Sequence, residues 1–292
     1  MTATLIRLKK STNVRLTRTP PPLRVAFGAL EVVAPAVSAR WAEYLWFRLP
    51  RRARSRRPLA GGTSFAAEVG GRKVTGMAWG SGPAVYLVHG WAGHAGQLVP
   101  FIGPLVERGF RVVAFDAPSH GASDPGASGP RSSTALEFVH ALTAVVAAQG
   151  PAYAIVAHSL GATATAVALC DGLTADRVVF LAPMASAAAY ARDLTAVLGA
   201  GPRTLRRLLR RIERRAGVPL RHFEVPELGR AVAMPPTLVV HDRHDASTDV
   251  GDGEAIAVAW PRAELMLTTG LGHRRILRDP GVVAQVVDFV TG

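Results

Sequence analysis

The chain has 292 residues, of which 49% are hydrophobic and 19% charged, and a formal net charge of +13 at pH 7. A chain of this length and hydrophobicity can bury a core that offsets the conformational entropy of folding, which excludes an intrinsically disordered protein. The single cysteine excludes a disulfide framework and a cysteine-ligated zinc site, and no apolar run is long enough to predict a transmembrane helix.

The positive charge is concentrated in two segments. Residues 1–57 contain 13 Lys and Arg against 2 acidic residues, and residues 186–236 contain ten Arg against four acidic residues. The rest of the chain is close to neutral. The charge therefore belongs to these segments and does not by itself indicate a nucleic-acid-binding protein.

Residues 1–60 are predicted to form a basic extension with a helical segment. Residues 1–22 are polar and basic, end in three prolines and predict a mobile tail. Apolar residues recur at roughly helical spacing over residues 23–49, where Pro35 would divide the helix into two pieces. A basic linker, residues 51–57, follows directly.

Two roles are open for this extension. The favoured one is a helix packed on the main domain. The alternative is a helix lying on an anionic membrane surface, where Trp41, Trp46 and the clustered arginines would suit the interface. Residues 37–39 resemble a signal-peptide cleavage site, but Glu31 interrupts the apolar region before them. We therefore expect a cytoplasmic protein, with peripheral membrane contact through residues 23–57 as the alternative.

From residue 64 onward the pattern alternates between strands and helices. Residues 65–69 and 73–79 predict a hairpin around two glycines. Six continuous apolar runs then predict strands buried on both faces, at 84–88, 111–115, 153–157, 177–181, 237–240 and 264–267. Helices are predicted between most of them, at 95–108, 132–148, 160–171, 251–260 and 277–290. The fold class is α/β, with a mostly parallel central sheet that binds ligands at the carboxyl ends of its strands.

One of these strand ends carries a candidate nucleophile. The strand at 153–157 runs into A-H-S-L-G, residues 157–161, and then into an alanine-rich helix. A serine in a sharp turn between strand and helix has its hydroxyl lifted above the sheet, and the residues two before and two after it must be small. Ala157 and Gly161 meet that requirement, which makes Ser159 the candidate nucleophile.

Four further motifs follow the expected strands in chain order. They are V-H-G-W at 88–91, D-A-P-S-H-G-A-S at 116–123, V-H-D-R-H-D at 240–245 and G-L-G-H at 270–273. With the serine turn, they resemble the α/β-hydrolase superfamily over residues 64–290. The chain departs from the usual motifs at Ala157 and Ser119, where glycine is common. The resemblance implies the α/β-hydrolase fold and a serine hydrolase activity.

The resemblance also implies a role for each site residue. Ser159 would attack an acyl carbon, and His273 would take its proton and later protonate the leaving group. Asp245 would hold the histidine tautomer. The backbone N–H groups of Trp91 and Leu160 would stabilise the oxyanion. His89, Gly90 and His158 are expected to line the pocket, although His89 fits a structural role in its loop better than a reactive one.

Two carboxylates compete for the role of the catalytic acid. The family pattern His-Gly-x-x-Asp aligns His241 with its histidine and Asp245 with its acid, so Asp242 occupies the glycine position. We expect Asp245 to be the acid and Asp242 to be the alternative. These residues lie close to His244 in the sequence, but no recognised zinc motif is present, so no metal is expected.

Residues 186–236 are predicted to form a helical cap inserted into a core of residues 61–185 and 237–292. Within the cap, residues Pro202–Ala216 are predicted to form an amphipathic helix with one leucine-rich face and one arginine-rich face. The arginine face is either solvated or attracts an anionic substrate or lipid headgroup.

The expected function is hydrolysis of a small-molecule carboxylic ester or thioester through an acyl-enzyme, without a cofactor. A serine in place of aspartate at the turn disfavours dehalogenases and epoxide hydrolases, and residues 89–93 lack the H-G-G-P-G of many peptidases. Carbon–carbon bond hydrolysis, perhydrolysis and acyl transfer use the same residues and remain alternatives. A non-catalytic, membrane-associated adaptor is the alternative from another class. No base-reading motif is present, so nucleic acid is not an expected partner.

Overall fold

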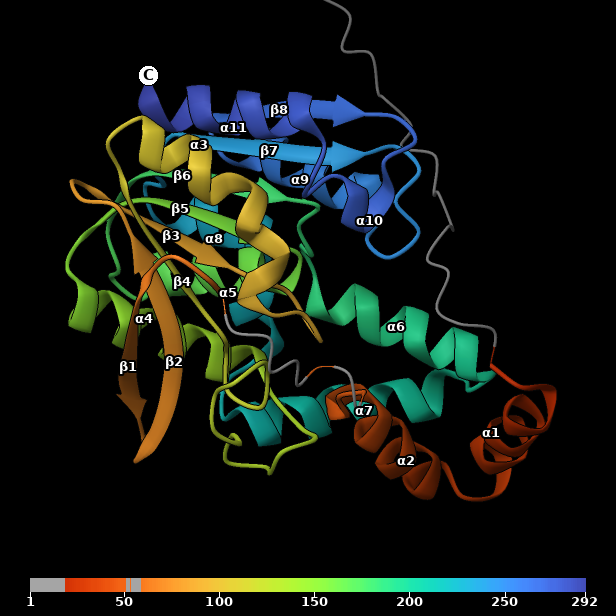
Figure 1. Cartoon of the computed structure of the whole chain (residues 1–292). Coiled ribbons are helices and arrows are strands. Elements are labelled where there is room, and N and C mark those ends of the chain that lie inside the picture. Colours follow the sequence, from red (N-terminus) through yellow and green to blue (C-terminus); the bar gives the residue numbers. More distant parts are fainter. Residues whose placement is uncertain (1–18, 51–52, 54–58) are drawn as a thin grey trace, which may run out of the picture.

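The computed structural model of the protein describes residues 19–50, 53 and 59–292 (Figure 1). Among these residues, one sheet contains eight strands in the order β1-β2-β4-β3-β5-β6-β7-β8. The strands are β1 (Thr63–Val69), β2 (Arg72–Trp79), β3 (Ala84–Val88), β4 (Arg111–Phe115), β5 (Ala152–His158), β6 (Ala175–Leu181), β7 (Thr237–Asp242) and β8 (Ala263–Thr268). β1 and β2 form the predicted hairpin, β2 pairs antiparallel with β4, and all other neighbours are parallel. The predicted fold class is confirmed.

Helices cover both faces of the sheet. On one face lie η2 (Ala95–Phe101), α3 (Ile102–Glu107) and α11 (Pro280–Thr291), and on the other α4 (Ala135–Gln149), α5 (Leu160–Cys170), α8 (Val225–Ala231) and α9 (Val250–Ala259). Alternate residues of β3 enter the two cores. Val85 and Leu87 pack into the core on one face, and Tyr86 and Val88 pack into the core on the other. This double burial is the reason that the strand sequences are continuously apolar.

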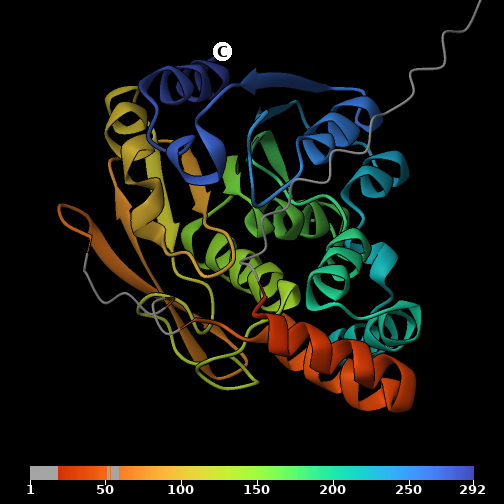
Figure 2. The same ribbon diagram turned by 90° about the vertical axis from the view of Figure 1, so that its right-hand side faces the viewer.

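The N-terminal segment forms two helices, α1 (Pro21–Val33) and α2 (Pro35–Phe47), divided at Pro35 as predicted. They pack on α6 (Ala187–Leu198) and α7 (Pro202–Ala216), the latter with the predicted bounds (Figures 1 and 2). Through these two helices the extension contacts the predicted cap, and after them Leu49 and Ala60 form hydrogen bonds with Arg131 and with Trp79 of β2. Residues 1–18 of the predicted tail, and the predicted linker except Ala53, lie outside the described residues.

Acidic side chains attach the two N-terminal helices to α7. The Glu31 carboxylate accepts hydrogen bonds from the backbone N–H groups of Arg203 (2.8 Å) and Thr204 (3.0 Å), and so caps the first turn of α7. Glu43 forms an ion pair with Arg211. In the described part of the chain, no helix is both long and apolar enough to cross a bilayer.

Candidate active site

Ser159 occupies a strained turn between β5 and α5. Its backbone has φ 53° and ψ −120°, a conformation that non-glycine residues rarely adopt. A Cβ on Gly161 would lie 2.6 Å from the carbonyl oxygen of His89, and one on Gly90 would lie 2.8 Å from Cβ of Ser159. Because both positions are glycine, the loop after β3 can approach the serine turn closely.

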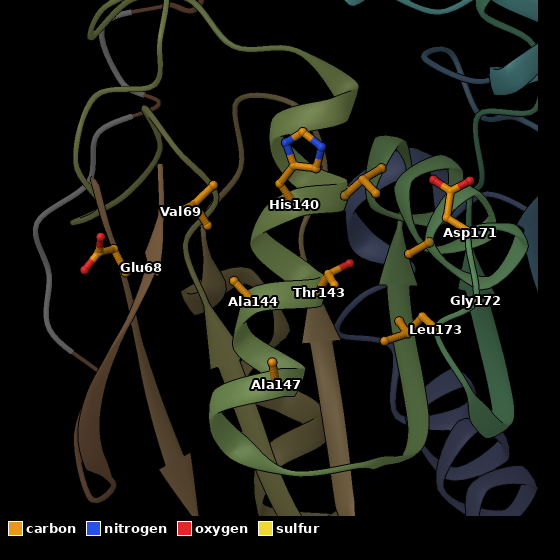
Figure 3. A pocket seen from close by; sticks show the side chains of 11 residues that line it. Glu68, Val69, His140, Thr143, Ala144, Ala147, Asp171, Gly172 and Leu173 are labelled. Atoms are coloured by element: carbon orange, nitrogen blue, oxygen red, sulfur yellow. The ribbon is translucent and has the colours of Figure 1, made fainter. Parts of the chain in front are cut away.

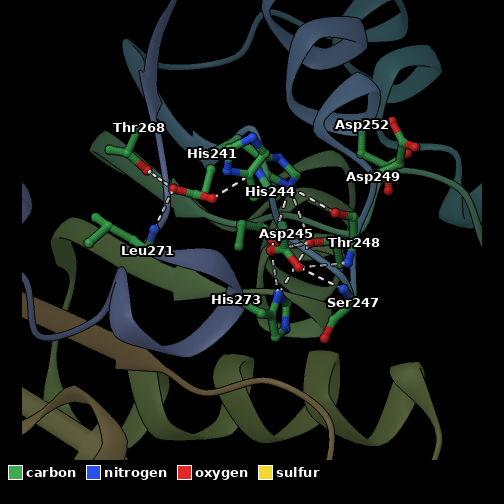
Figure 4. Close-up of polar contacts among 12 residues, drawn as sticks. His241, His244, Asp245, Ser247, Thr248, Asp249, Asp252, Thr268, Leu271 and His273 are labelled. Carbon is green, nitrogen blue, oxygen red and sulfur yellow. Dashed lines mark hydrogen bonds and ion pairs between the residues drawn. The ribbon is translucent and has the colours of Figure 1, made fainter. Parts of the chain in front are cut away.

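His273 and Asp245 form a hydrogen-bonded pair (Figure 4). Nδ1 of His273 donates to Oδ2 of Asp245 over 2.8 Å, and the Asp245 side chain is fully buried. The same carboxylate accepts hydrogen bonds from the backbone N–H groups of Ser247 (2.7 Å) and Thr248 (3.1 Å). Burial alone would raise the pKa of Asp245, but the hydrogen bond and charge of His273 and these N–H donors hold the pKa below its ordinary value. Asp245 is therefore ionised at neutral pH and fixes the His273 ring.

Asp242 serves a different set of partners. Its Oδ1 accepts a hydrogen bond from the backbone N–H of His244 (2.9 Å), and its Oδ2 from the Thr268 hydroxyl (2.8 Å) and the backbone N–H of Leu271 (2.9 Å). These bonds join the ends of β7 and β8 to the loop that precedes His273. The geometry therefore favours Asp245 as the partner of His273 and gives Asp242 the task of holding the loop.

Thr248 is a site residue that the sequence analysis missed. Its hydroxyl donates to Oδ2 of Asp245 (2.9 Å) and lies 3.2 Å from both Nδ1 of His273 and Nε2 of His241. Nε2 of His241 lies 3.8 Å from the Asp245 carboxylate, and burial lowers the pKa of His241. No sequence signal marks Thr248, because its role depends on how the loop after Asp245 folds back.

His89 and His120 hold the loop after β3. Nε2 of His89 accepts the backbone N–H of Ala117 (3.0 Å) and Nε2 of His120 accepts that of Ala92 (3.1 Å), while the Nδ1 atoms face the carbonyl oxygens of Gly90 and Pro118. Burial lowers the pKa of His89 to about 4 and that of His120 to about 3. Both rings are therefore neutral and engaged with the backbone.

The two expected oxyanion donors belong to the two segments that approach each other at the serine turn. Trp91 belongs to the loop that these histidines hold, and Leu160 is the first residue of α5. Within the described residues, neither backbone N–H has a hydrogen-bond acceptor. Both groups are thus available to an oxyanion formed beside Ser159.

His158 links the serine turn to the histidine loop. Its Nε2 donates to the carbonyl oxygen of His273 (3.0 Å), and the two imidazole rings lie 4.5 Å apart. Burial, and then the neighbouring His273, lower the pKa of His158 well below its ordinary value. In the described residues no hydrogen bond joins the Ser159 hydroxyl to Nε2 of His273, a contact that often tightens only when substrate binds.

A surface groove of the structure lies away from the serine turn. A groove of about 560 Å³ is lined by residues of β1, α4 and the end of α5, among them Glu68, His140 and Asp171 (Figure 3). It lies at the opposite end of α5 from Ser159 and contains none of the expected site residues. Over the described ranges, no group of three or more His, Cys, Asp or Glu side chains is arranged to hold a metal ion.

Known proteins resemble this chain in sequence and in fold. Residues 82–234 match the family described as serine aminopeptidase, S33. The chain is 26% identical over 245 residues to the pimeloyl-[acyl-carrier protein] methyl ester esterase of Nitrosomonas europaea, an alignment that covers 69% of this chain and 92% of that protein.

Two solved structures illustrate the shared fold. An esterase from Rhodococcus sp. ECU1013 has a TM-score of 0.57 and 19% identity, over 78% of this chain and 98% of its own. A thioesterase domain from the curacin biosynthetic pathway has a TM-score of 0.58 and 17% identity, over 80% of this chain and 100% of its own. At such identities the likeness concerns the fold alone.

Proposed function

Because the chain belongs to the α/β-hydrolase superfamily, within the family described as serine aminopeptidase S33, we propose that it is a serine esterase. It hydrolyses a small carboxylic ester or thioester through an acyl-enzyme. The observation that carries the proposal is the buried Asp245–His273 hydrogen bond of 2.8 Å beside the strained turn of Ser159. A surface histidine would not need an ionised, fully buried carboxylate.

The proposed reaction follows from the geometry of these residues. The Ser159 oxygen attacks the acyl carbon as Nε2 of His273 takes the hydroxyl proton, and the carbonyl oxygen becomes an oxyanion held by the N–H groups of Trp91 and Leu160. The imidazolium then protonates the leaving alcohol or thiol. Water, activated by the same nitrogen, releases the acid and restores Ser159. Asp245 keeps the proton of His273 on Nδ1 throughout.

The choice of an ester over a peptide substrate rests on two observations. The curated relative is named as a methyl ester esterase, and residues 89–93 of this chain, H-G-W-A-G, lack the H-G-G-P-G motif of many peptidases. The family description names a peptidase, so an aminoacyl amide belongs in the substrate panel.

We also propose that residues 186–236 cap the site, inserted into a core of residues 61–185 and 237–292. Two contacts support this division. The Tyr190 hydroxyl of α6 donates to the carbonyl oxygen of Ser247, in the loop that carries Asp245 and Thr248 (3.0 Å). The backbone N–H of Ala185, just before the cap, donates to the carboxylate of Asp252 (3.1 Å).

Labelling with a fluorophosphonate, followed by peptide mapping, tests the nucleophile. We expect one adduct, on Ser159, that Ser159→Ala abolishes. p-Nitrophenyl esters, acyl thioesters and aminoacyl p-nitroanilides then distinguish esterase, thioesterase and peptidase activity. An adduct on another residue, or unchanged ester hydrolysis by Ser159→Ala, would refute the assignment. Absence of labelling in the folded protein would favour the non-catalytic adaptor.

A further inference from the structure

Helix α1 exposes apolar side chains on its outer face, although Leu23 and Phe27 pack into the core. Its side chains Val25, Val32 and Val33 are 73%, 69% and 78% exposed. Both of its charged residues bind neighbouring helices: the exposed Arg24 donates to the carbonyl oxygen of Val197, and Glu31 caps α7. The outer face of a surface helix ordinarily carries polar and charged residues, so three exposed valines on one helix are unusual.

Helix α2 continues this surface with aromatic and basic residues. Val37, Trp41 and Tyr44 recur at the spacing of one helix face and are all exposed. Arg40 is exposed on the same face, and the Arg48 guanidinium lies 4.9 Å from the centre of the Tyr44 ring. The only acidic residue of α2, Glu43, faces α7 and pairs with Arg211.

The exposed residues of α1 and α2, here called the α1–α2 face, stand out from the rest of the described surface. Over all the described residues, nine large hydrophobic side chains are exposed. Six of the nine belong to this face: Val25, Val32, Val33, Val37, Trp41 and Tyr44. Clusters of exposed apolar side chains on a protein mark sites of interaction.

The charge around this face identifies the kind of partner. Helix α7, on which α2 packs, exposes six arginines: Arg203, Arg206, Arg207, Arg210, Arg214 and Arg215. Residues 1–57 as a sequence carry 13 basic residues against two acidic ones, and the structure turns both acidic side chains inward. A second copy of the chain would bring like charge to like charge. A surface of anionic lipids supplies the opposite charge and an apolar layer beneath it.

We propose that the α1–α2 face docks on an anionic lipid bilayer, with both helices lying in the interface. Valines of α1 enter the acyl boundary, Trp41 and Tyr44 lie at the headgroup level, and Arg40 and the α7 arginines contact the lipid phosphates. Figures 1 and 2 show α1 and α2 at one end of the molecule, where no other described helix covers them. The face is separate from Ser159, so binding is independent of the proposed esterase activity.

Flotation with lipid vesicles tests the proposal on the full chain and on Ser159→Ala. We expect both proteins to bind vesicles of phosphatidylcholine mixed with phosphatidylglycerol, not vesicles of phosphatidylcholine alone, and to dissociate as salt screens the charges. Equal binding to both vesicle types, or binding to neither, would overturn the proposal.

Exposed valines provide a matched pair of variants. Val25→Ser with Val33→Ser should lower vesicle binding at least about tenfold, because the buried apolar area is lost. Val258→Ser, at an 85% exposed valine of α9, should leave it unchanged. Since all three side chains are largely exposed, each variant should keep its Tm. Binding unaffected by the double substitution would contradict docking through this face.

Separate variants test the role of Arg40 and the entry of Trp41 into the bilayer. Arg40→Gln should lower binding about fivefold, whereas Arg262→Gln, at an exposed arginine before β8, should not. The blue shift of tryptophan emission on anionic vesicles should be smaller in Trp41→Phe, which keeps an aromatic ring against Phe27. A different result would assign the face to a second copy of the chain: the unmodified protein does not bind vesicles but self-associates, and Val25→Ser with Val33→Ser abolishes that self-association.

Discussion

Asp245 and Asp242 lie three residues apart, yet their carboxylates have different partners. Asp245 binds His273 over 2.8 Å, with Thr248 as a second hydroxyl donor. Asp242 binds Thr268 and the backbone of the loop before His273. At this scale one carboxylate acts on the imidazole and the other on the position of its loop, and removal of each should have a different effect.

Asparagine substitutions separate these two roles. Asp245→Asn should reduce kcat for an ester about a thousandfold or more, because the amide no longer stabilises the imidazolium or its tautomer. Asp242→Asn should mainly reduce stability, by about 1–3 kcal/mol, because backbone N–H groups lose a charged acceptor. Kinetics and denaturant unfolding of both variants check this. A larger loss of kcat in Asp242→Asn than in Asp245→Asn would make Asp242 the catalytic acid instead.

The neutral histidines of the loop after β3 predict acid sensitivity. Burial lowers the pKa of His89 to about 4 and that of His120 to about 3, from an ordinary 6.5. Between pH 6.5 and 4 the unfolded chain therefore binds more protons than the native one, so the free energy of unfolding falls as pH falls. The loss is about 3 kcal/mol per histidine over that window. Asp245, whose folded pKa is depressed, adds a further loss only below its unfolded pKa.

Denaturant unfolding at a series of pH values measures this effect. His120→Gln keeps a polar side chain without an imidazole, so its free energy of unfolding should decline less steeply between pH 6.5 and 4. His244→Gln, at an exposed histidine, is the control and should keep the slope of the unmodified protein. Identical slopes in all three proteins would show that His120 binds its proton at the same pH in the native and unfolded chains, against the expected lowering of its pKa.

At the scale of elements, the site depends on how closely α5 approaches the loop after β3. Gly161 in the first turn of α5 faces the carbonyl oxygens of His89 and Val88, at 2.6 and 2.7 Å from an added Cβ. Only a residue without a side chain permits this approach. Leu160, a proposed oxyanion donor, directly precedes Gly161, so we propose that this packing also sets the position of its N–H group.

An alanine pair tests that coupling. Gly161→Ala should cost about 2 kcal/mol of stability and lower kcat more than it raises KM, because the two oxyanion donors move apart. Gly103→Ala in α3, where an added Cβ meets nothing within 4 Å, should be stabilising by about 0.5–1 kcal/mol through helix propensity. Normal kcat in Gly161→Ala would mean that the oxyanion donors do not depend on this contact.

At the scale of the whole molecule, the N-terminal helices and the predicted cap form one packed unit. Phe27 of α1 is fully buried and stacks on Trp41 of α2 at 4.8 Å between ring centres. Glu31 and Glu43 bind α7, more than 150 residues later in the chain. The extension is thus a structural layer over α6 and α7, and weakening its packing should lower the stability of the protein.

Truncation of the buried ring checks this dependence. Phe27→Ala should lower stability by about 3–5 kcal/mol, because it leaves a cavity between α1 and its neighbours, and should expose α1 and α2 to limited proteolysis. Val25→Ala, two residues away on the outward face, should change the Tm little. An unchanged Tm in Phe27→Ala would mean that α1 contributes nothing to the folded unit.

The sequence alone predicted the sheet, most helices, the division at Pro35 and the family. Continuous apolar runs mark strands buried on both faces, and proline cannot continue a helix, so local chemistry settles both features. It also identified Ser159, His273 and Asp245 as candidates through motifs at strand ends.

Only the tertiary structure gave the partners of the Asp245 and Asp242 carboxylates, placed Thr248 beside them and showed His89 and His120 bound to backbone groups. It also showed that Glu31 and Glu43 face α7, which leaves an apolar and basic surface outside. Such facts depend on which side chains meet after the loops close and the helices pack. Hydrophobic pattern and motif order act over a few neighbouring residues, whereas a hydrogen bond between positions 245 and 273 exists only once the whole sheet has assembled.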